Sequence, residues 1–202
     1  MSLYPPGKRL VDLTLALVGL ILAAPLLAVL AVVVKLDSRG SIFFGHERVG
    51  RYRRPFKVWK IRTMVSGAHR AGAELTAKGD PRITRVGRVL RRHKLDEIPQ
   101  LWNVLRGEMS FVGPRPEVDR YVRLFPSEYD SLLRIRPGIT DWASLAYLDE
   151  EEILANAEDP EGDYVNQILP QKLALNLEYL EKRSMSEDMK IIANTLLRVL
   201  RR

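Results

Sequence analysis

The chain has 202 residues, a length that fits one domain with a sizeable hydrophobic core. It carries 32 Lys and Arg residues against 25 Asp and Glu residues, so its net charge of +7 favours an anionic partner: a phospholipid surface, a phosphorylated substrate or nucleic acid. The sequence contains no cysteine, which excludes a disulfide framework, a thiol nucleophile, a thiolate zinc finger and an iron–sulfur cluster.

An uncharged segment of 22 residues, Leu13 to Val34, lies near the N-terminus. As a straight helix it would be about 33 Å long, enough to cross a hydrocarbon core of about 30 Å. Pro25 lies near its middle, where a missing backbone hydrogen bond predicts a kink or a break. The basic residues that flank its two ends are Lys8 and Arg9, and Lys35 and Arg39.

Two membrane topologies fit this segment. One is a single-pass anchor. The other is a re-entrant helix that turns at Ala24-Pro25 and returns to the side from which it entered, which leaves both basic flanks on the cytoplasmic face. Asp12, at the mouth of the segment, is interpreted as a charge partner of Lys8 or Arg9.

Charge is segregated along the rest of the chain. Ser38 to Leu95 holds sixteen Lys or Arg residues against three acids, whereas Pro137 to Gln171 holds nine acids and no Lys or Arg. A basic block after a membrane segment is typical of attraction to anionic headgroups, at about 1 kcal/mol per cation. Electrostatic binding of nucleic acid is the alternative.

The predicted elements are mixed. Ser41 to Phe44 and Phe56 to Arg62 resemble short strands, and the second alternates so poorly that it predicts a bulge or a strand lying on the membrane surface. Asp80 to Arg82 predicts a turn before a helix that contains Ile83, Val86 and Leu90.

Two amphipathic helices are predicted near the C-terminus. The first places Leu173, Leu177 and Leu180 on one face. The second runs from Asp188 to Arg202 and is basic, so it either packs in a core or lies in a lipid interface. Its apolar side is predicted to hold Met189, Ile192, Leu196 and Val199.

The segment Leu95 to Gly107 is the most informative. Helical spacing predicts one buried face, and the helix is expected to end at Gly107. Pro99 fits only the first turn, which places Asp96 and Glu97 at the positive end of the helix dipole. The predicted buried face consists of Ile98, Leu101, Trp102 and Leu105.

An acidic pair at a helix start is commonly a cap, so a nucleophilic or metal-binding role requires a phosphate site nearby. Arg115, on a loop with a proline on either side, is suited to hold phosphate or a planar base, and Arg134 to Thr140 offers a second such turn. The three histidines, including His69, are far apart in sequence, so a metal bound here would be Mg²⁺ with oxygen ligands.

Several motifs in order resemble the bacterial sugar transferase family, the monotopic phosphoglycosyl transferases. They are Lys8-Arg9, Ala24-Pro25, Phe56 to Met64, Leu95 to Leu101, Gly113 to Pro116 and Arg136 to Thr140. The resemblance implies an α+β, mostly helical monotopic membrane protein, the minimal catalytic form of the family. It implies a re-entrant membrane helix at residues 1–37 and a membrane-associated catalytic domain at 38–202 on the cytoplasmic face of the bacterial inner membrane, with short strands and amphipathic interfacial helices.

The resemblance also implies an activity: transfer of a sugar 1-phosphate from a UDP-sugar to polyprenyl (undecaprenyl) phosphate, with release of UMP. It implies that Asp96 is the nucleophile, which forms a covalent aspartyl-phosphosugar, and that Glu97 binds Mg²⁺. The lipid bilayer is then a partner and nucleic acid is not. The residues expected to bind substrate and phosphate are Lys60, Arg62, Arg91, Arg115 and Arg136.

The chain departs from the family pattern at three places: Ala24 replaces the usual Ser, Asp141 to Ser144 replaces a Gly and Gln region, and Asn176 replaces a common Asp. The alternative hypothesis is a basic membrane adaptor or nucleic-acid-binding protein without catalysis. The sequence does not determine the sugar, the length of the polyprenyl tail or the role of residues 149–163. The pathway is also open, with capsule, exopolysaccharide, O-antigen and protein glycosylation as options. The oligomeric state is open as well, with a homo-oligomer as one option.

Overall fold

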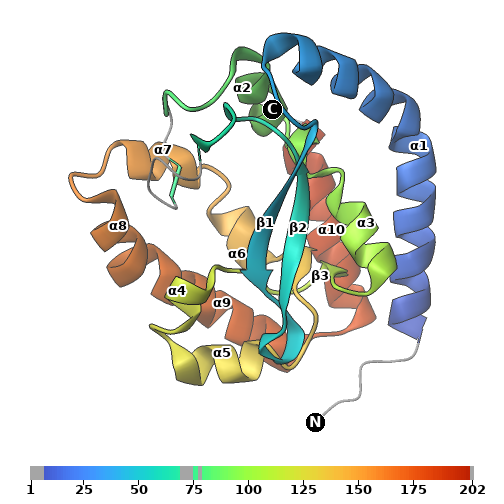
Figure 1. The fold of residues 1–202 in the computed structure, drawn as a ribbon. Coiled ribbons are helices and arrows are strands. Elements are labelled where there is room, and N and C mark those ends of the chain that lie inside the picture. Colours follow the sequence, from blue (N-terminus) through green and yellow to red (C-terminus); the bar gives the residue numbers. More distant parts are fainter. Residues whose placement is uncertain (1–6, 69–74, 77–78, 201–202) are drawn as a thin grey trace.

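The computed structural model describes residues 7–68, 75–76 and 79–200, which are mostly helical with two small sheets. Its first element is α1, Gly7–Asp37, a single helix that contains Pro25. Figure 1 shows α1 as a curved helix that runs along one side of the molecule and arches over toward α2. The proline therefore bends the helix but does not end it, because neighbouring turns keep their hydrogen bonds.

A β-hairpin follows, formed by β1 (Phe43–Val49) and β2 (Pro55–Ile61) around the short turn η1 (Arg51–Arg53). The antiparallel register is unbroken from Phe43 opposite Ile61 to Val49 opposite Pro55, so the expected bulge in β2 is wrong. The first strand also begins later and extends further than the predicted Ser41 to Phe44. Gly45 does not end β1. The Trp59 ring packs against this glycine, with a ring carbon only 3.2 Å from the position that a Cβ would occupy.

The next elements are α2 (Arg85–Arg92), η3 (Leu95–Glu97) and α3 (Gln100–Arg106). Thr84 caps α2 by accepting a hydrogen bond from the Gly87 amide at 2.9 Å. Asp96 and Glu97 lie in η3, the short 3₁₀ turn that precedes α3, and Gly107 ends α3 with a φ of 81°. The predicted start and end of this helix are confirmed.

The predicted buried face of α3 is wrong in part. The side chain of Trp102 is exposed, while Asn103 and Val104 are fully buried. Asn103 is satisfied in the interior because its amide accepts a hydrogen bond from the Trp59 amide at 3.0 Å and donates to the Lys57 carbonyl at 2.7 Å. Leu101 instead approaches α1, 3.1 Å from where a Cβ on Gly19 would be.

A second sheet pairs β3 (Ser110–Val112) in parallel with β4 (Gly138–Thr140). The helices α4 (Asp119–Val122) and α5 (Pro126–Leu132) connect the two strands. Gly113 and Gly138 approach each other so closely that a Cβ on Gly138 would overlap the Gly113 backbone. This contact joins the loop that carries Arg115 to the turn that carries Arg136.

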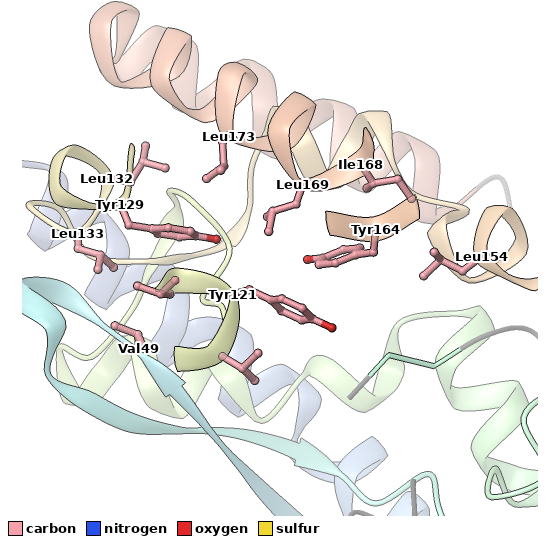
Figure 2. Close-up of a cluster of buried hydrophobic side chains, with 12 residues drawn as sticks. Val49, Tyr121, Tyr129, Leu132, Leu133, Leu154, Tyr164, Ile168, Leu169 and Leu173 are labelled. Carbon is pink, nitrogen blue, oxygen red and sulfur yellow. The ribbon is translucent and has the colours of Figure 1, made fainter. Parts of the chain in front are cut away.

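Helices form the C-terminal part. They are α6 (Trp142–Ala146), α7 (Glu150–Ala155), α8 (Pro160–Asp163), the π-helical turn η4 (Tyr164–Ile168), α9 (Leu169–Lys182) and α10 (Met185–Leu200). The largest core cluster lies between α9, η4, α4 and α5, as Figure 2 shows. Leu173 is in this core, with Leu177 and Leu180 packed against it, which confirms the predicted face of α9.

The apolar stripe predicted for α10 is divided between two environments. The completely buried residue is Ile191, which the prediction did not include, whereas the predicted Met189 and Leu196 are about half exposed, so the predicted apolar side is wrong in part. Asp188 helps to set which face of α10 is buried. Its buried carboxylate accepts a hydrogen bond from the Tyr179 hydroxyl at 2.6 Å and pairs with Lys8 of α1.

Candidate active site

The candidate site is a cavity of about 480 Å³. Its wall is formed by η3, the loop after β3, and the helices α7, α9 and α10. Its charged lining residues include Lys60, Glu97 and Arg115. Its apolar lining residues include Ile98, Leu101, Phe111, Ile139, Ile192 and Leu196. A cavity with a few convergent charges beside an apolar wall suits an amphipathic ligand.

Glu97 connects two of the charged lining residues. Its carboxylate accepts a hydrogen bond from Lys60 Nζ at 3.0 Å and another, shorter one from Arg115 Nη2. Burial alone would raise the pKa of this carboxyl, but Arg115 and Lys60 together hold the pKa of Glu97 well below its usual range. Glu97 is therefore an anion held between two cations.

Asp96 has a different environment. Its side chain is buried, with Oδ2 4.0 Å from Lys60 Nζ and with Oδ1 buried and without a hydrogen-bond partner among the described residues. Burial raises the pKa of Asp96, an effect that Lys60 partly opposes. A buried carboxylate oxygen without a partner, beside a charged cavity, is a typical feature of a functional carboxylate.

Arg115 is fixed by its own loop as well as by Glu97. Its backbone amide donates to Asp141 Oδ2 at 3.0 Å, and its Nη1 donates to the Ile139 carbonyl at 3.0 Å. Asp141 also caps α6 by accepting from the Ser144 amide. Asp141 was not among the predicted site residues, although an Asp directly before a helix start is a recognisable N-cap signal.

Arg91 reaches the cavity from α2. Its Nη2 lies 2.5 Å from a carboxylate oxygen of Glu151, which belongs to α7 and to the acidic segment 149–163. The acidic segment therefore contributes two carboxylates, Glu150 and Glu151, to the cavity wall. Sequence reasoning missed this role of Glu151, because the two partners are 60 residues apart.

Two predicted phosphate-binding residues do not line the cavity. Arg62 is buried and donates to the carbonyls of Ser38 and Val34, at 2.6 Å and 3.3 Å, where α1 ends. Arg136 donates from Nε to the Gly107 carbonyl at 2.8 Å, and burial, with Arg9 nearby, lowers its pKa. In this structure both arginines bind backbone carbonyls.

The residues at the cavity fit Mg²⁺, although no group of three or more His, Asp or Glu side chains that could hold a metal occurs among the described residues. Mg²⁺ in phosphoryl-transfer enzymes commonly uses one or two carboxylates together with substrate phosphates. Glu97 lines the cavity and could supply one such carboxylate. Asp96, the next residue, does not line the cavity, but its buried and unpartnered Oδ1 could supply a second.

Both ends of α1 are held by the rest of the protein. Near its start, Asp12 accepts from Ser110 Oγ at 2.9 Å and lies 3.6 Å from Lys8 Nζ, which confirms that Asp12 is a charge partner. Near its end, Leu30 and Val34 pack against Ile61 and Leu90. The exposed apolar residues between them include Leu17, Val18, Ile21, Leu22, Leu26 and Val29.

By length and composition, α1 is apolar enough to cross a membrane, and the remaining described helices do not meet that criterion. Its long apolar face is exposed, as expected of a segment in contact with lipid. This feature indicates that the protein associates with a membrane.

Comparisons with known proteins identify the family. The family model for the bacterial sugar transferase matches residues 3–202. Undecaprenyl-phosphate glucose phosphotransferase of Komagataeibacter xylinus is 40% identical over 198 residues, which cover 95% of this chain and 35% of that protein. UDP-N-acetylgalactosamine-undecaprenyl-phosphate N-acetylgalactosaminephosphotransferase of Aeromonas hydrophila is 39% identical over 148 residues, which cover 72% and 35%.

A third relative is covered over two thirds of its length. The UDP-glucose:undecaprenyl-phosphate glucose-1-phosphate transferase of Caulobacter vibrioides is 36% identical over 192 residues, covering 94% of this chain and 68% of that protein. By contrast, the chain spans about a third of the length of the K. xylinus and A. hydrophila proteins. Since the family model matches nearly the whole sequence, this chain belongs to the bacterial sugar transferase family.

Proposed function

We propose that this protein transfers a sugar 1-phosphate from a UDP-sugar to polyprenyl phosphate and releases UMP. Three relatives whose names describe sugar phosphotransfer to undecaprenyl phosphate support this activity. The cavity supports it independently, because its lining combines cationic side chains that suit phosphates with apolar side chains that suit a lipid.

The reaction would proceed by two displacements. The Asp96 carboxylate attacks the phosphorus that carries the sugar, which forms an aspartyl-phosphosugar and breaks the bond to UMP, and UMP leaves with the electron pair. A phosphate oxygen of polyprenyl phosphate then attacks the same phosphorus, which releases the carboxylate and forms the lipid diphosphate sugar. Two steps allow the water-soluble nucleotide to leave before the lipid reacts.

The cations near Asp96 would oppose the repulsion between a carboxylate and the phosphates. Lys60 and Arg115 are held in place by Glu97, so they are already oriented when substrate binds. Mg²⁺, held by Glu97 and Asp96 together with substrate phosphates, would supply further neutralisation of the charge on the transferring group.

We propose that α1 is re-entrant and that residues 38–202 lie on the cytoplasmic face of the inner membrane. Asp12 and Val34, near opposite ends of α1, both contact residues of the same folded unit, so a straight crossing would place one contact on the wrong side. Basic residues flank both ends, as expected for two cytoplasmic ends. The exposed apolar residues of α3 and α10, such as Trp102 and Leu196, would then lie in the lipid interface.

Because the chain contains no cysteine, single-cysteine labelling tests this topology directly. Leu10→Cys and Arg39→Cys introduce thiols at exposed positions near the two ends of α1. A membrane-impermeant maleimide should label both in inside-out vesicles and neither in intact cells with a permeabilised outer membrane. Labelling of the two positions from opposite sides would establish a spanning helix.

The observation that most strongly supports the activity is the pair Asp96 and Glu97 beside the cavity with Lys60 and Arg115. UMP release by the purified protein in nanodiscs tests it, with Mg²⁺, undecaprenyl phosphate and a panel of UDP-sugars that includes UDP-glucose and UDP-N-acetylgalactosamine. Acceptor-dependent UMP release is expected with at least one donor. A folded protein that releases no UMP from any donor would overturn the proposal. Salt-sensitive nucleic-acid binding by that protein would then support the adaptor hypothesis, which the comparisons do not favour.

A further inference from the structure

The charges of the cavity wall are nearly all paired. Six basic residues line it: Arg48, Lys60, Arg91, Lys94, Arg115 and Lys172. Five of them form ion pairs with glutamates that also line the cavity, the partners being Glu97, Glu117, Glu150 and Glu151. Within the part of the chain that the structure describes, Lys94 is the remaining basic residue of this wall and has no ion pair or side-chain hydrogen bond.

We propose that Lys94 is a substrate-binding residue that holds a phosphate group of the donor or of the lipid acceptor. The proposal rests on the activity proposed above and adds a residue to which neither the sequence motifs nor the comparisons assign a role. Both substrates carry phosphate, so the chemistry of recognition is shared between them, and the experiment below distinguishes the two sources.

The backbone at Lys94 fixes where its side chain begins. Lys94 has a φ of 55° and a ψ of 20°, a left-handed conformation that few residues other than glycine adopt. Two hydrogen bonds hold it, from its own amide to the Arg91 carbonyl at 3.1 Å and from the Glu97 amide to its carbonyl at 3.2 Å. Unfavourable backbone conformations that the surrounding structure maintains tend to occur at functional sites.

Charge balance indicates what Lys94 would bind. The wall holds six cations and four glutamates, and Asp96 next to it brings the carboxylates to five, so the excess positive charge corresponds to one lysine. The other cations of the wall each already have a carboxylate partner, whereas Lys94 has no ion pair among the described residues.

Four variants of the full chain in nanodiscs test the proposal. Lys94→Met removes the charge, Lys94→Arg keeps it, and Lys94→Gly removes it while relieving the left-handed backbone. The matched control is Lys57→Met, which removes the same charge from an exposed position on β2. For each, we would measure binding of UDP and of polyprenyl phosphate, together with KM for both substrates, kcat and the melting temperature.

We expect Lys94→Met and Lys94→Gly to bind one of the two ligands about 10- to 100-fold more weakly, with a matching rise in the KM for that substrate, as for loss of a charged hydrogen bond. Lys94→Arg should recover most of the affinity, and Lys94→Gly should melt at or above the wild-type temperature, which separates binding from folding. The ligand affected identifies which phosphate Lys94 holds.

Equal affinities of Lys94→Met and Lys57→Met for both ligands would overturn the inference, whether or not the protein turns over. Conversely, wild-type protein that binds both ligands in a Lys94-dependent manner but releases no UMP would overturn only the proposed activity. A wild type that binds neither ligand would overturn both.

Discussion

The cavity presents carboxylates from two regions that differ in burial. The first is η3, which supplies Glu97, held by two cations, and next to it the buried Asp96, which does not itself line the cavity. The second is α7, which supplies Glu151, whose side chain is 41% exposed while it pairs with Arg91. Water screens an exposed pair and can replace either partner, whereas a buried charge depends on the partners it already has. The comparison separates fixed charges, which shape the site, from exchangeable charges, which substrate can displace.

The largest expected effect is on Asp96. Asp96→Asn should lower the rate of UMP release at least about a thousandfold, because an amide cannot act as the nucleophile. Its free energy of unfolding should stay the same or increase, because burial raises the pKa of Asp96 and ionisation is therefore unfavourable there. UMP release and urea unfolding of the same preparation measure both. Retained turnover in the variant would transfer the nucleophilic role to another group.

Glu97→Gln should damage both activity and stability. It removes the carboxylate that Lys60 and Arg115 share, which should lower the free energy of unfolding by about 2 kcal/mol. Because the folded-state pKa of Glu97 is depressed, its contribution is complete above the usual glutamate pKa of 4.5 and is lost as the pH falls through the lower folded-state pKa. Urea unfolding at several pH values should therefore show a difference in the free energy of unfolding between wild type and variant that becomes smaller at acidic pH. A difference that is constant with pH would mean that the ion pairs contribute nothing.

Glu151→Gln should have a smaller effect, in the opposite direction for binding. Releasing Arg91 from Glu151 should lower the KM for the UDP-sugar about two- to fivefold, because an exposed ion pair no longer competes with phosphate. The control is Glu158→Gln, an exposed position in the same acidic segment. An increase in KM specific to Glu151→Gln would show that the carboxylate positions Arg91 for substrate.

The smallest effect is expected at the outer part of the acidic segment. Glu161 pairs with Arg120, and both side chains are exposed. Glu161→Gln should change the free energy of unfolding by less than about 0.5 kcal/mol at physiological salt, because solvent screens the pair. Urea unfolding at low and at physiological salt tests this. A larger loss that persists at physiological salt would contradict the distinction between the two regions.

Local signals in the sequence predicted much of this arrangement. Pro99 and Gly107 marked the start and end of α3, which placed Asp96 and Glu97 correctly at its beginning. The leucine spacing of α9 identified its core face. These features depend on residues within a few turns of one another, where helix geometry determines which side chains share a face.

Long-range contacts account for the errors. Trp102 matched the apolar spacing of α3 but is exposed, because Asn103 finds hydrogen-bond partners in the β2 backbone and takes its place in the interior. The sequence also could not show that Arg62 binds carbonyls at the end of α1, since its nearest partner in sequence is 24 residues away. The sequence identifies chemically capable side chains, and only the tertiary structure decides which of them share one cavity.

The attachment of α1 at both ends limits how this helix can change. Each residue added to a helix rotates everything beyond it by about 100° and advances it by 1.5 Å. A one-residue insertion between Ala16 and Leu30 would therefore turn one of the two anchored ends away from its contacts, even if the inserted residue were fully compatible with lipid. Mutational scans should find this stretch permissive to apolar substitution and intolerant of insertion and deletion, so its length is under stronger constraint than its composition.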